Sequence, residues 1–393
     1  MKTHVIVFPG SNCDRDVAVA IQNIIGSSPE MVWHKDSTIN QSDLIVVPGG
    51  FSYGDYLRCG AMASTSPIMK SVIENANKGV PVMGICNGFQ ILIESGLLQG
   101  ALMRNSSLSF ICRDIIIKPT NTKTIFTNKS TISKMPIAHN EGNYFANSNQ
   151  IKEIEDNDQI AFQYCDENGD INAHSNPNGS INNIAGVFNK SKNVLGMMPH
   201  PERTENGDQI FSSMKEFIQM GNPITDHDLA HNQESYRLKS YSADESCTEW
   251  LVNMIITDNE AVSVQNALIQ LGYDIVLTRQ THWEIETAGE KENILEKIEA
   301  SGELYNSNKE FIGKRETNDG TVSILVHQKE DMHGRLKQES LTDRFQIDGL
   351  IKIKRGVVWN LSTKRGNIDT IINEVLETNI LFNPLSHECY RIN

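Results

Sequence analysis

VPVMGICNGFQILIESGLL, residues 80–98, is the stretch that decides the fold. An apolar strand runs into Gly84-Ile85-Cys86-Asn87-Gly88, and apolar residues at helical spacing follow. A strand that turns abruptly into a helix, with glycine two residues either side of a nucleophile, is a nucleophile elbow, here with cysteine in place of serine. The glycines are needed because the turn is strained and the helix packs closely on the strand. At the helix N-terminus the sulfur is favoured as a thiolate, so Cys86 is the predicted nucleophile.

Further apolar runs on either side of this elbow predict the rest of the sheet. His4–Phe8 and Asp43–Val47 read as strands, and each leads into glycine-containing turns, PGSNCD and PGGFSYGD. Alternation of such runs with amphipathic stretches over the first ~220 residues is typical of an α/β unit with an open, mostly parallel sheet. Loops at the carboxyl ends of parallel strands form the ligand crevice, so we expect these turns to converge on Cys86.

The segment GMMPHPERT, which follows an apolar run at 194–198, supplies a candidate base. A cysteine nucleophile needs a group that holds and returns its proton, and His200 is the best candidate among the histidines. Pro201 is expected to keep this segment extended, so that Glu202, two residues on, points the same way as His200 and fixes the ring. Cys86, His200 and Glu202 are therefore the predicted catalytic triad.

Acyl transfer also requires donors for a tetrahedral oxyanion, and GGFSYGDYLRCG offers a flexible glycine turn whose N–H groups can face the sulfur. The backbone N–H groups of Phe51 and Asn87 are the predicted pair. Together with Gly50 and Gln90, they form the candidate oxyanion and substrate-binding set. The alternative interpretation of GGFSYGD is a tight turn with no role in catalysis.

Length and composition limit the remaining possibilities. A chain of 393 residues with 39% hydrophobic and 21% charged residues predicts two or three folded globular units. The net charge of -14 argues against nucleic acid or an anionic membrane as partner, and no apolar stretch is long enough for a spanning helix or signal peptide. Seven scattered cysteines without a C-x-x-C pair predict reduced thiols, no metal site and a cytoplasmic location.

A repeat appears in the last 145 or so residues, as expected of a module built from two similar units. Trp283 in LTRQTHWEIET matches Trp359 in IKRGVVWNLST, and Asn306 in ELYNSNKEF matches Asn383 in ILFNPLSHE. Each copy is predicted to be α+β, in the order strand, helix, strand, strand, helix. Two copies would share a buried face as a pseudo-dimer. The alternative is chance similarity between two amphipathic helices.

Together these patterns predict four segments. They are an α/β domain at 1–222, a polar linker at 223–247, a first repeat at 248–316 and a second repeat at 317–393.

The motifs PGSNCDRD, PGGFSYGDYLRCGA, GICNGFQ, PIAHNEGNY and MMPHPER resemble those of class I glutamine amidotransferases, and more narrowly the glutaminase subunits of phosphoribosylformylglycinamidine synthase. One departure is Asn140, where that family usually has glycine. The resemblance covers about residues 1–220. Residues 250–392 resemble two tandem copies of the small accessory subunit of the same enzyme, through the aromatic of the middle strand and the L-x-N-P type of ending.

The resemblance implies hydrolysis of glutamine through a Cys86 thioester and delivery of ammonia to a separate synthetase subunit that makes formylglycinamidine ribonucleotide in purine biosynthesis. It implies no cofactor in this chain, and ATP and Mg²⁺ on the partner synthetase; no phosphate-binding G-x-x-x-x-G-K-[ST] motif occurs here. Two other functions stay open at this point. One is a stand-alone cysteine–histidine hydrolase or peptidase of related fold, and the other is a non-catalytic bridging scaffold.

Overall fold

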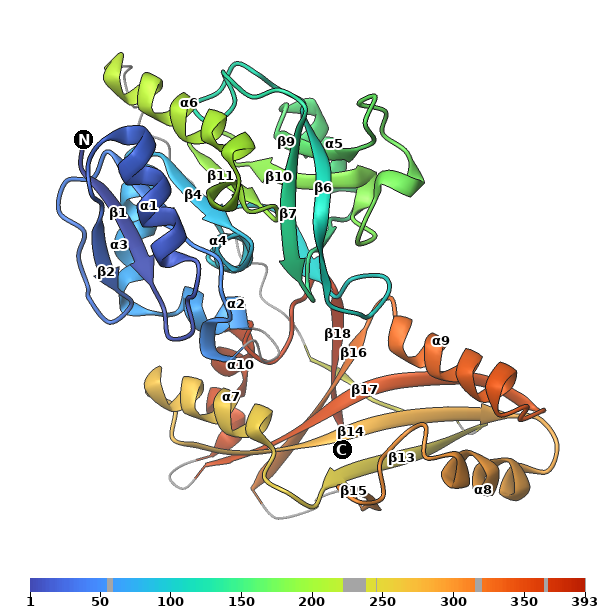
Figure 1. Cartoon of the computed structure of the whole chain (residues 1–393). Coiled ribbons are helices and arrows are strands. Elements are labelled where there is room, and N and C mark those ends of the chain that lie inside the picture. The colour runs from blue at the N-terminus through green and yellow to red at the C-terminus, as the bar shows by residue number, and fades with distance from the viewer. Residues whose placement is uncertain (55–58, 222–237, 245, 315–319, 364–366, 393) are drawn as a thin grey trace. The chain divides into compact units, whose positions relative to one another are not determined.

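The computed structural model describes residues 1–54, 59–221, 238–244, 246–314, 320–363 and 367–392 (Figure 1). The chain forms two compact units, Met1–Gln233 and Glu234–Asn393. The boundary between them falls inside the predicted linker, most of which, 223–237, lies outside the described residues. In the described ranges, no helix combines the length and apolarity needed to cross a bilayer.

The first unit is built on a nine-stranded sheet with the order β2-β1-β3-β4-β11-β10-β9-β6-β7. Its parallel half consists of β2 (Glu30–Trp33), β1 (Thr3–Val7), β3 (Leu44–Val47), β4 (Val82–Ile85) and β11 (Val194–Met197). Its antiparallel half consists of β10 (Ile184–Phe188), β9 (Ile160–Cys165), β6 (Ile111–Pro119) and β7 (Ser133–His139). The predicted strands are confirmed, whereas the antiparallel half was not expected.

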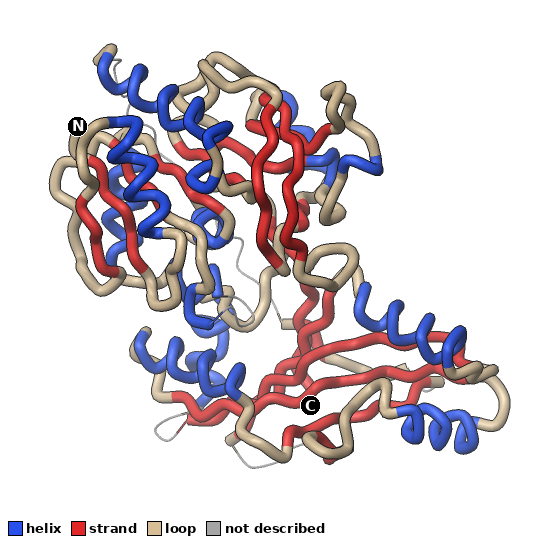
Figure 2. The backbone as a smooth tube through the Cα atoms, in the orientation of Figure 1, coloured by secondary structure: helices blue, strands red, loops and turns tan. Residues whose placement is uncertain are grey.

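Most of the helices flank the parallel strands (Figure 2), and two further strands form a small separate sheet. The helices are α1 (Asp14–Ile25), α2 (Cys59–Ser64), α3 (Pro67–Asn77), α4 (Asn87–Glu94), α5 (Ser148–Asp156) and α6 (Asp208–Gln219); the small sheet pairs β5 (Ala101–Met103) with β8 (Asn143–Phe145). Strands β3 and β4 are buried along their whole length, as expected of parallel strands covered on both faces.

Helix α1 illustrates how the sequence sets these elements. It begins after Cys13 with two aspartates in its first turn, and it ends at Gly26, whose φ of 90° is the left-handed conformation that terminates helices. Val17, Ile21 and Ile25 recur every four residues and are buried. The helix therefore buries one apolar stripe, and it packs beside α6, where Lys215 Nζ donates to the Ile24 carbonyl at 2.7 Å.

The second unit is a seven-stranded sheet with the order β12-β18-β16-β17-β14-β13-β15 (Figure 1). The strands are β12 (Lys239–Ser240), β13 (Cys247–Met254), β14 (Ile275–Thr287), β15 (Glu310–Gly313), β16 (Thr321–Gln328), β17 (Leu350–Thr363) and β18 (His387–Ile392). The helices are α7 (Asn259–Gln270), α8 (Lys291–Ser301), α9 (Met332–Glu339) and α10 (Ile368–Glu377), with a π-helical turn, η6 (Ser340–Arg344), after α9.

The element order in this unit corrects one prediction. Each half runs strand, helix, strand, helix, strand, not strand, helix, strand, strand, helix. The two middle strands that were expected are one continuous strand, β14 or β17, because no turn interrupts its apolar alternation. Each half then closes with a further strand after its second helix, β15 or β18, which was not predicted.

The two long strands pair antiparallel at the centre of the sheet. Thr281 lies opposite Val357, Trp283 opposite Arg355, and Arg279 opposite Trp359. Both tryptophans are almost fully buried. Trp283 packs with residues of α8 and the neighbouring strands, so the core of this unit forms on the face that carries the tryptophans.

Candidate active site

Cys86 occupies the tight turn between β4 and α4. Its φ of 52° and ψ of -107° are unusual for a residue with a side chain, and its side chain is buried apart from a small exposed fraction. Its N–H donates to the Met197 carbonyl at 2.8 Å, and its Sγ lies 3.7 Å from the Ala138 carbonyl. The predicted elbow is therefore present, with the strained residue at the position of the sulfur.

The two flanking glycines are required by packing. A Cβ on Gly88 would lie 1.9 Å from the carbonyl oxygen of Val47 in β3. A Cβ on Gly84 would lie 2.6 Å from Leu92 Cδ1 and 2.7 Å from the Gly88 carbonyl oxygen. Neither space admits a methyl group, so helix α4 can approach β3 and β4 this closely only because both positions are glycine.

His200 and Glu202 come from the loop after β11, the strand that pairs with β4. The N–H of His200 donates to the Pro136 carbonyl at 2.9 Å. His200 Nδ1 lies 2.7 Å from Glu202 Oε1, and the two side chains are 3% and 0% exposed. The predicted pairing of this imidazole with this carboxylate is present, and it fixes which ring nitrogen is free for chemistry.

The reason given for that pairing was wrong. Residues Pro201–Arg203 form a 3₁₀ turn, not an extended segment. Proline stands at the first position of the turn, which its fixed φ favours. A tight turn brings residue i+2 back toward residue i, so the carboxylate reaches the ring by curvature of the chain and not by alternation along a strand.

Cys86 and His200 meet at Gly49, which follows β3. A Cβ on Gly49 would lie 2.8 Å from His200 Cε1, 3.2 Å from Cys13 Sγ and 3.3 Å from Cys86 Cβ. Burial opposes the charge on His200, but the negative charges of Cys86 and Glu202 outweigh it and raise the pKa of His200 well above its ordinary value. The arrangement therefore favours the charged, imidazolium form of His200.

The predicted oxyanion pair is corrected in part. The N–H of Phe51 donates to the Gly10 carbonyl at 2.9 Å, so it does not face the sulfur. Gly50, with φ of 151°, forms a bridge with Ser11, which ties the loop after β3 to the loop after β1. Asn87 remains where predicted, since it opens α4 directly after Cys86 and its backbone N–H belongs to the first turn, where helical N–H groups have no acceptor within the helix. Residues 55–58 of GGFSYGDYLRCG lie outside the described part.

The side chains of Asn87 and Gln90 bind each other. Asn87 Nδ2 donates to Gln90 Oε1 at 2.7 Å, and Gln90 Nε2 donates to the Glu141 carbonyl at 3.0 Å. The hydroxyl of Ser52 donates to Asn87 Oδ1. The side chain of Gln90 is thus placed beside the elbow, as predicted, but its terminal amide is held by protein groups.

Residues 136–141, at the end of β7, were missed as site residues. Three backbone carbonyls of this segment contact the site. That of Pro136 accepts the His200 N–H, that of Ala138 lies beside Cys86 Sγ, and that of Glu141 accepts Gln90 Nε2. Sequence patterns do not show this, because the contacts are made by backbone atoms. Asn140, the departure from the family pattern, is exposed; its carbonyl accepts the Asn105 N–H at 2.8 Å, and its φ is not positive, so glycine is not needed there.

Cys13 is a second thiol that the sequence did not single out. Cys13, His200 and Glu202 each place one donor atom within 4.8 Å of the others, as metal ligands can. The 2.7 Å between His200 Nδ1 and Glu202 Oε1 is a hydrogen-bond distance. Two ligands of a tetrahedral ion with bonds of about 2.0–2.1 Å would lie roughly 3.4 Å apart, so this set fits a proton and not a metal.

The CobB/CobQ-like glutamine amidotransferase domain matches residues 1–224. This range contains the elbow, the paired His200 and Glu202, and the loop after β3. The chain belongs to this glutamine amidotransferase family. The phosphoribosylformylglycinamidine synthase subunit PurQ of Pelagibacter ubique is 62% identical to this amidotransferase over 205 residues, 52% of this chain and 90% of the relative. The subunit PurQ of Chlorobium luteolum is 50% identical over 220 residues, 53% of this chain and 95% of the relative. A chain of the solved PurLQS structure from Thermotoga maritima is 40% identical, with a TM-score of 0.49, and covers 55% of this chain and 98% of that one.

Proposed function

We propose that the chain hydrolyses glutamine to glutamate and ammonia as the glutaminase component of a phosphoribosylformylglycinamidine synthase. The observation that carries this function is the 62% identity to a subunit of that enzyme over nearly the whole length of the relative. The site is consistent with it, because a cysteine at an elbow and a buried His–Glu pair are the groups that acyl transfer needs.

In the first half of the reaction, the Cys86 thiolate attacks the side-chain carbonyl carbon of glutamine and forms a tetrahedral oxyanion. The imidazolium of His200 gives its proton to the amide nitrogen, the carbon–nitrogen bond breaks, and ammonia leaves. A glutamyl thioester and a neutral imidazole remain. Glu202 holds Nδ1 through this step, so Nε2 is the nitrogen that faces the reacting atoms.

In the second half, the neutral His200 takes a proton from water, and the resulting hydroxide attacks the thioester carbonyl. The carbon–sulfur bond breaks, glutamate leaves, and the thiolate–imidazolium pair is restored. The backbone N–H of Asn87, at the start of α4 beside Cys86, is the proposed donor to the oxyanion in both halves.

The ammonia passes to a separate synthetase subunit that uses ATP and Mg²⁺ to convert formylglycinamide ribonucleotide to formylglycinamidine ribonucleotide. A partner is supported by the names of the relatives, which are subunits of that synthase. Binding of ATP and Mg²⁺ on the partner, and not on this chain, is supported by the lack of a phosphate-binding motif in the sequence. The cytoplasmic location stays a prediction.

The second unit is proposed to be two tandem accessory-subunit-like repeats that form a pseudo-dimer and bridge the glutaminase to the synthetase. The strand register supports this. Thr281 pairs with Val357, its own equivalent at an offset of 76 residues, while the pairs Trp283–Arg355 and Arg279–Trp359 exchange under the same offset. A pseudo-twofold axis between Thr281 and Val357 would produce this register.

The loops after the second helix of each half support the same proposal. Asn306 Oδ1 accepts the N–H of residue 308 at 3.0 Å, and Asn383 Oδ1 accepts the N–H of residue 385 at 2.8 Å. The carbonyl of each asparagine accepts the N–H groups three and four residues on. The matching asparagines of the two copies therefore make the same turn.

The test of the glutaminase is glutamine-dependent amidine formation with the purified synthetase, comparing Cys86→Ala with Cys13→Ala. Both substitutions remove a thiol beside His200. We expect Cys86→Ala to abolish glutamine-dependent activity and to leave ammonia-dependent activity unchanged, whereas Cys13→Ala keeps both. Retention of glutamine-dependent activity in Cys86→Ala refutes Cys86 as the nucleophile. If the synthetase is equally active with the unmodified chain and with a chain that carries both substitutions, the chain acts as a scaffold.

The bridge is tested by cross-linking the full chain to the synthetase and mapping the joined lysines by mass spectrometry. Lysines of the second unit, such as Lys337 or Lys354, are expected to join the synthetase. Cross-links from the first unit alone refute the bridging role. Peptide hydrolysis by the chain in the absence of the synthetase would favour the stand-alone hydrolase.

A further inference from the structure

A buried pair of histidines lies on the face of the second sheet opposite the tryptophans. His282 in β14 and His327 in β16 are 0% and 1% exposed, and both lie opposite Gly356 in the intervening strand β17. The three residues therefore form one row across three strands. The imidazole rings of His282 and His327 stack over the middle strand, with centroids 5.5 Å apart and planes inclined by 29°.

Gly356 makes this meeting possible. Strands separated by one other strand lie about 9.6 Å apart, twice the usual spacing, and a side chain on the middle strand would fill the gap. A Cβ at Gly356 would lie 2.4 Å from His327 Cδ2 and 2.6 Å from its Nε2. The missing side chain opens a space into which a nitrogen of His327 points.

Three donor atoms converge on that space. His327 Nε2 lies 3.4 Å from His282 Nδ1 and 3.6 Å from Oε1 of Glu284, which is two residues along β14 from His282. Because His282 and Glu284 are two residues apart in β14, their side chains lie on the same face of the strand. The first separation joins two nitrogens and the second joins a nitrogen to an oxygen, and both exceed the usual 2.7–3.2 Å of an N–H···O hydrogen bond. They match the roughly 3.4 Å between two ligands of a tetrahedral ion with bonds of about 2.0–2.1 Å.

The tautomer of His282 agrees with a ligand role. His282 Nε2 lies 2.8 Å from Glu249 Oε1 in β13, so this nitrogen carries the proton and Nδ1 presents its lone pair to the space. A carboxylate that holds the far nitrogen of a histidine ligand is a common partner in metal sites. The hydroxyl of Tyr241 donates to Glu284 Oε1 at 2.6 Å, and its ring lies edge-on to both imidazoles, which fixes the three donors in place.

We propose that His282 Nδ1, His327 Nε2 and the Glu284 carboxylate bind a divalent transition metal ion, with Zn²⁺ the best fit, and that Glu249 positions His282. Two imidazoles and one carboxylate are a ligand set of Zn²⁺ with a further position left for water. The ion joins β14 to β16 across Gly356, and so it ties together the two halves of the second unit.

The electrostatics of the cluster are consistent with this role. The carboxylates of Glu284 and Glu249 face the two imidazole rings, and Lys354 Nζ, 4.0 Å from Glu284 Oε2, is a cation beside them. The sequence predicted no metal site because the two histidines are 45 residues apart along the chain and form no spaced motif.

The test is metal binding by the full chain after removal of bound metal with a chelator, with Zn²⁺ followed by calorimetry and Co²⁺ by visible absorption. We expect about one ion per chain, as for a single three-ligand site, and a tetrahedral Co²⁺ spectrum without a sulfur charge-transfer band. His327→Gln should abolish binding, and Glu249→Gln should weaken it by about 10- to 100-fold. His333→Gln, on α9, removes a histidine of the same unit outside the cluster and should bind as the unmodified chain does.

Gly356→Ala keeps every ligand and fills the gap with one methyl group, so it should also lose binding while circular dichroism shows the fold retained. Equal Zn²⁺ binding by the unmodified chain and His327→Gln overturns the proposal. No binding by the unmodified chain also overturns it and leaves a proton between the two imidazoles. A sulfur charge-transfer band that disappears in Cys86→Ala assigns the metal to the thiols of the first unit and overturns it as well.

Discussion

Removing the charge of Glu202 while keeping its shape is the most direct test of how the site works. Glu202→Gln replaces a fully buried carboxylate that lies 2.7 Å from His200 Nδ1. A hydrogen bond between charged groups contributes about 1.5–3 kcal/mol. If the imidazolium is needed in the transition state, kcat/KM for glutamine should fall roughly 10- to 150-fold, since each 1.36 kcal/mol is a factor of ten.

The pH profile gives this prediction a sign. Glu202 is one of the two charges that raise the pKa of His200, so the substitution should lower that pKa. The imidazolium that protonates the leaving ammonia is then lost at a lower pH. The alkaline limb of the kcat/KM profile should therefore move to lower pH in Glu202→Gln, which loss of packing alone would not produce.

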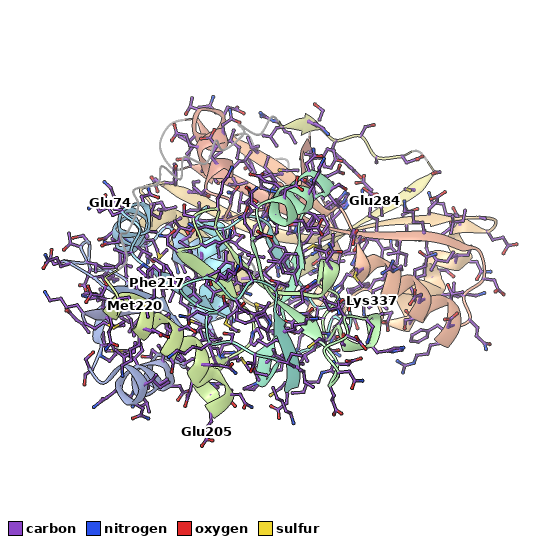
Figure 3. All side chains as sticks on the ribbon, turned by 90° about the horizontal axis from the view of Figure 1, so that it is seen from above. Glu74, Glu205, Phe217, Met220, Glu284 and Lys337 are labelled. Atoms are coloured by element: carbon purple, nitrogen blue, oxygen red, sulfur yellow. The ribbon has the colours of Figure 1, made fainter. Side chains whose placement is uncertain are left out.

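The assay is glutamine-dependent amidine formation with the synthetase across the pH range, with ammonia-dependent formation measured in parallel. The matched control is Glu205→Gln, three residues on, whose side chain is exposed at the edge of its unit (Figure 3). Its kcat/KM should stay unchanged. A Glu202→Gln enzyme with the rate and the alkaline limb of the unmodified chain would refute the assignment of Glu202.

Three further predictions concern stability. Gly88→Ala should lower the free energy of unfolding by about 1–3 kcal/mol in urea titration, because the new Cβ meets the Val47 carbonyl; an unchanged value contradicts the packing argument. Burial lowers the pKa of His139 from 6.5 to about 4, so the unfolded chain takes up this proton more readily and the free energy of unfolding should fall by about 3 kcal/mol as pH falls from 6.5 to 4. Hydrogen exchange of the first unit should show this loss in the unmodified chain and not in His139→Gln. Equal losses in the two proteins exclude His139 as the source. Arg279→Met, which removes the mostly buried cation that Asp258 and Glu260 share, should cost about 3 kcal/mol, whereas Arg391→Met at a half-exposed pair should cost about 0–1 kcal/mol. Equal thermal unfolding of the two variants would contradict the difference in burial.

The first unit shows which features a linear pattern can predict. The strands around 4–8, 43–47 and 81–85 were predicted from short apolar runs followed by glycine turns, because burial on both faces demands such runs. The antiparallel half was missed because its strands β6 and β7 mix buried residues with exposed and polar ones. Which of their residues are buried depends on neighbouring strands far along the chain.

The candidate site divides in the same way. The elbow at Cys86 is a local device, and its glycines and apolar flanks are visible in the sequence. The Phe51 N–H could not be assigned correctly, because its acceptor, the Gly10 carbonyl, belongs to a different loop. Backbone carbonyls such as that of Ala138 have no signature in the sequence at all.

The sequence by itself determined the strained turn that carries the sulfur and the apolar strands that support it. These features depend on near neighbours in the chain, through backbone strain and the periodicity of burial. Only the tertiary structure decided which N–H groups are already bonded and that His282 and His327 meet over Gly356. Strand order brings such groups together across dozens of residues, and a hydrogen bond or a ligand distance depends on tenths of an ångström that no residue pattern records.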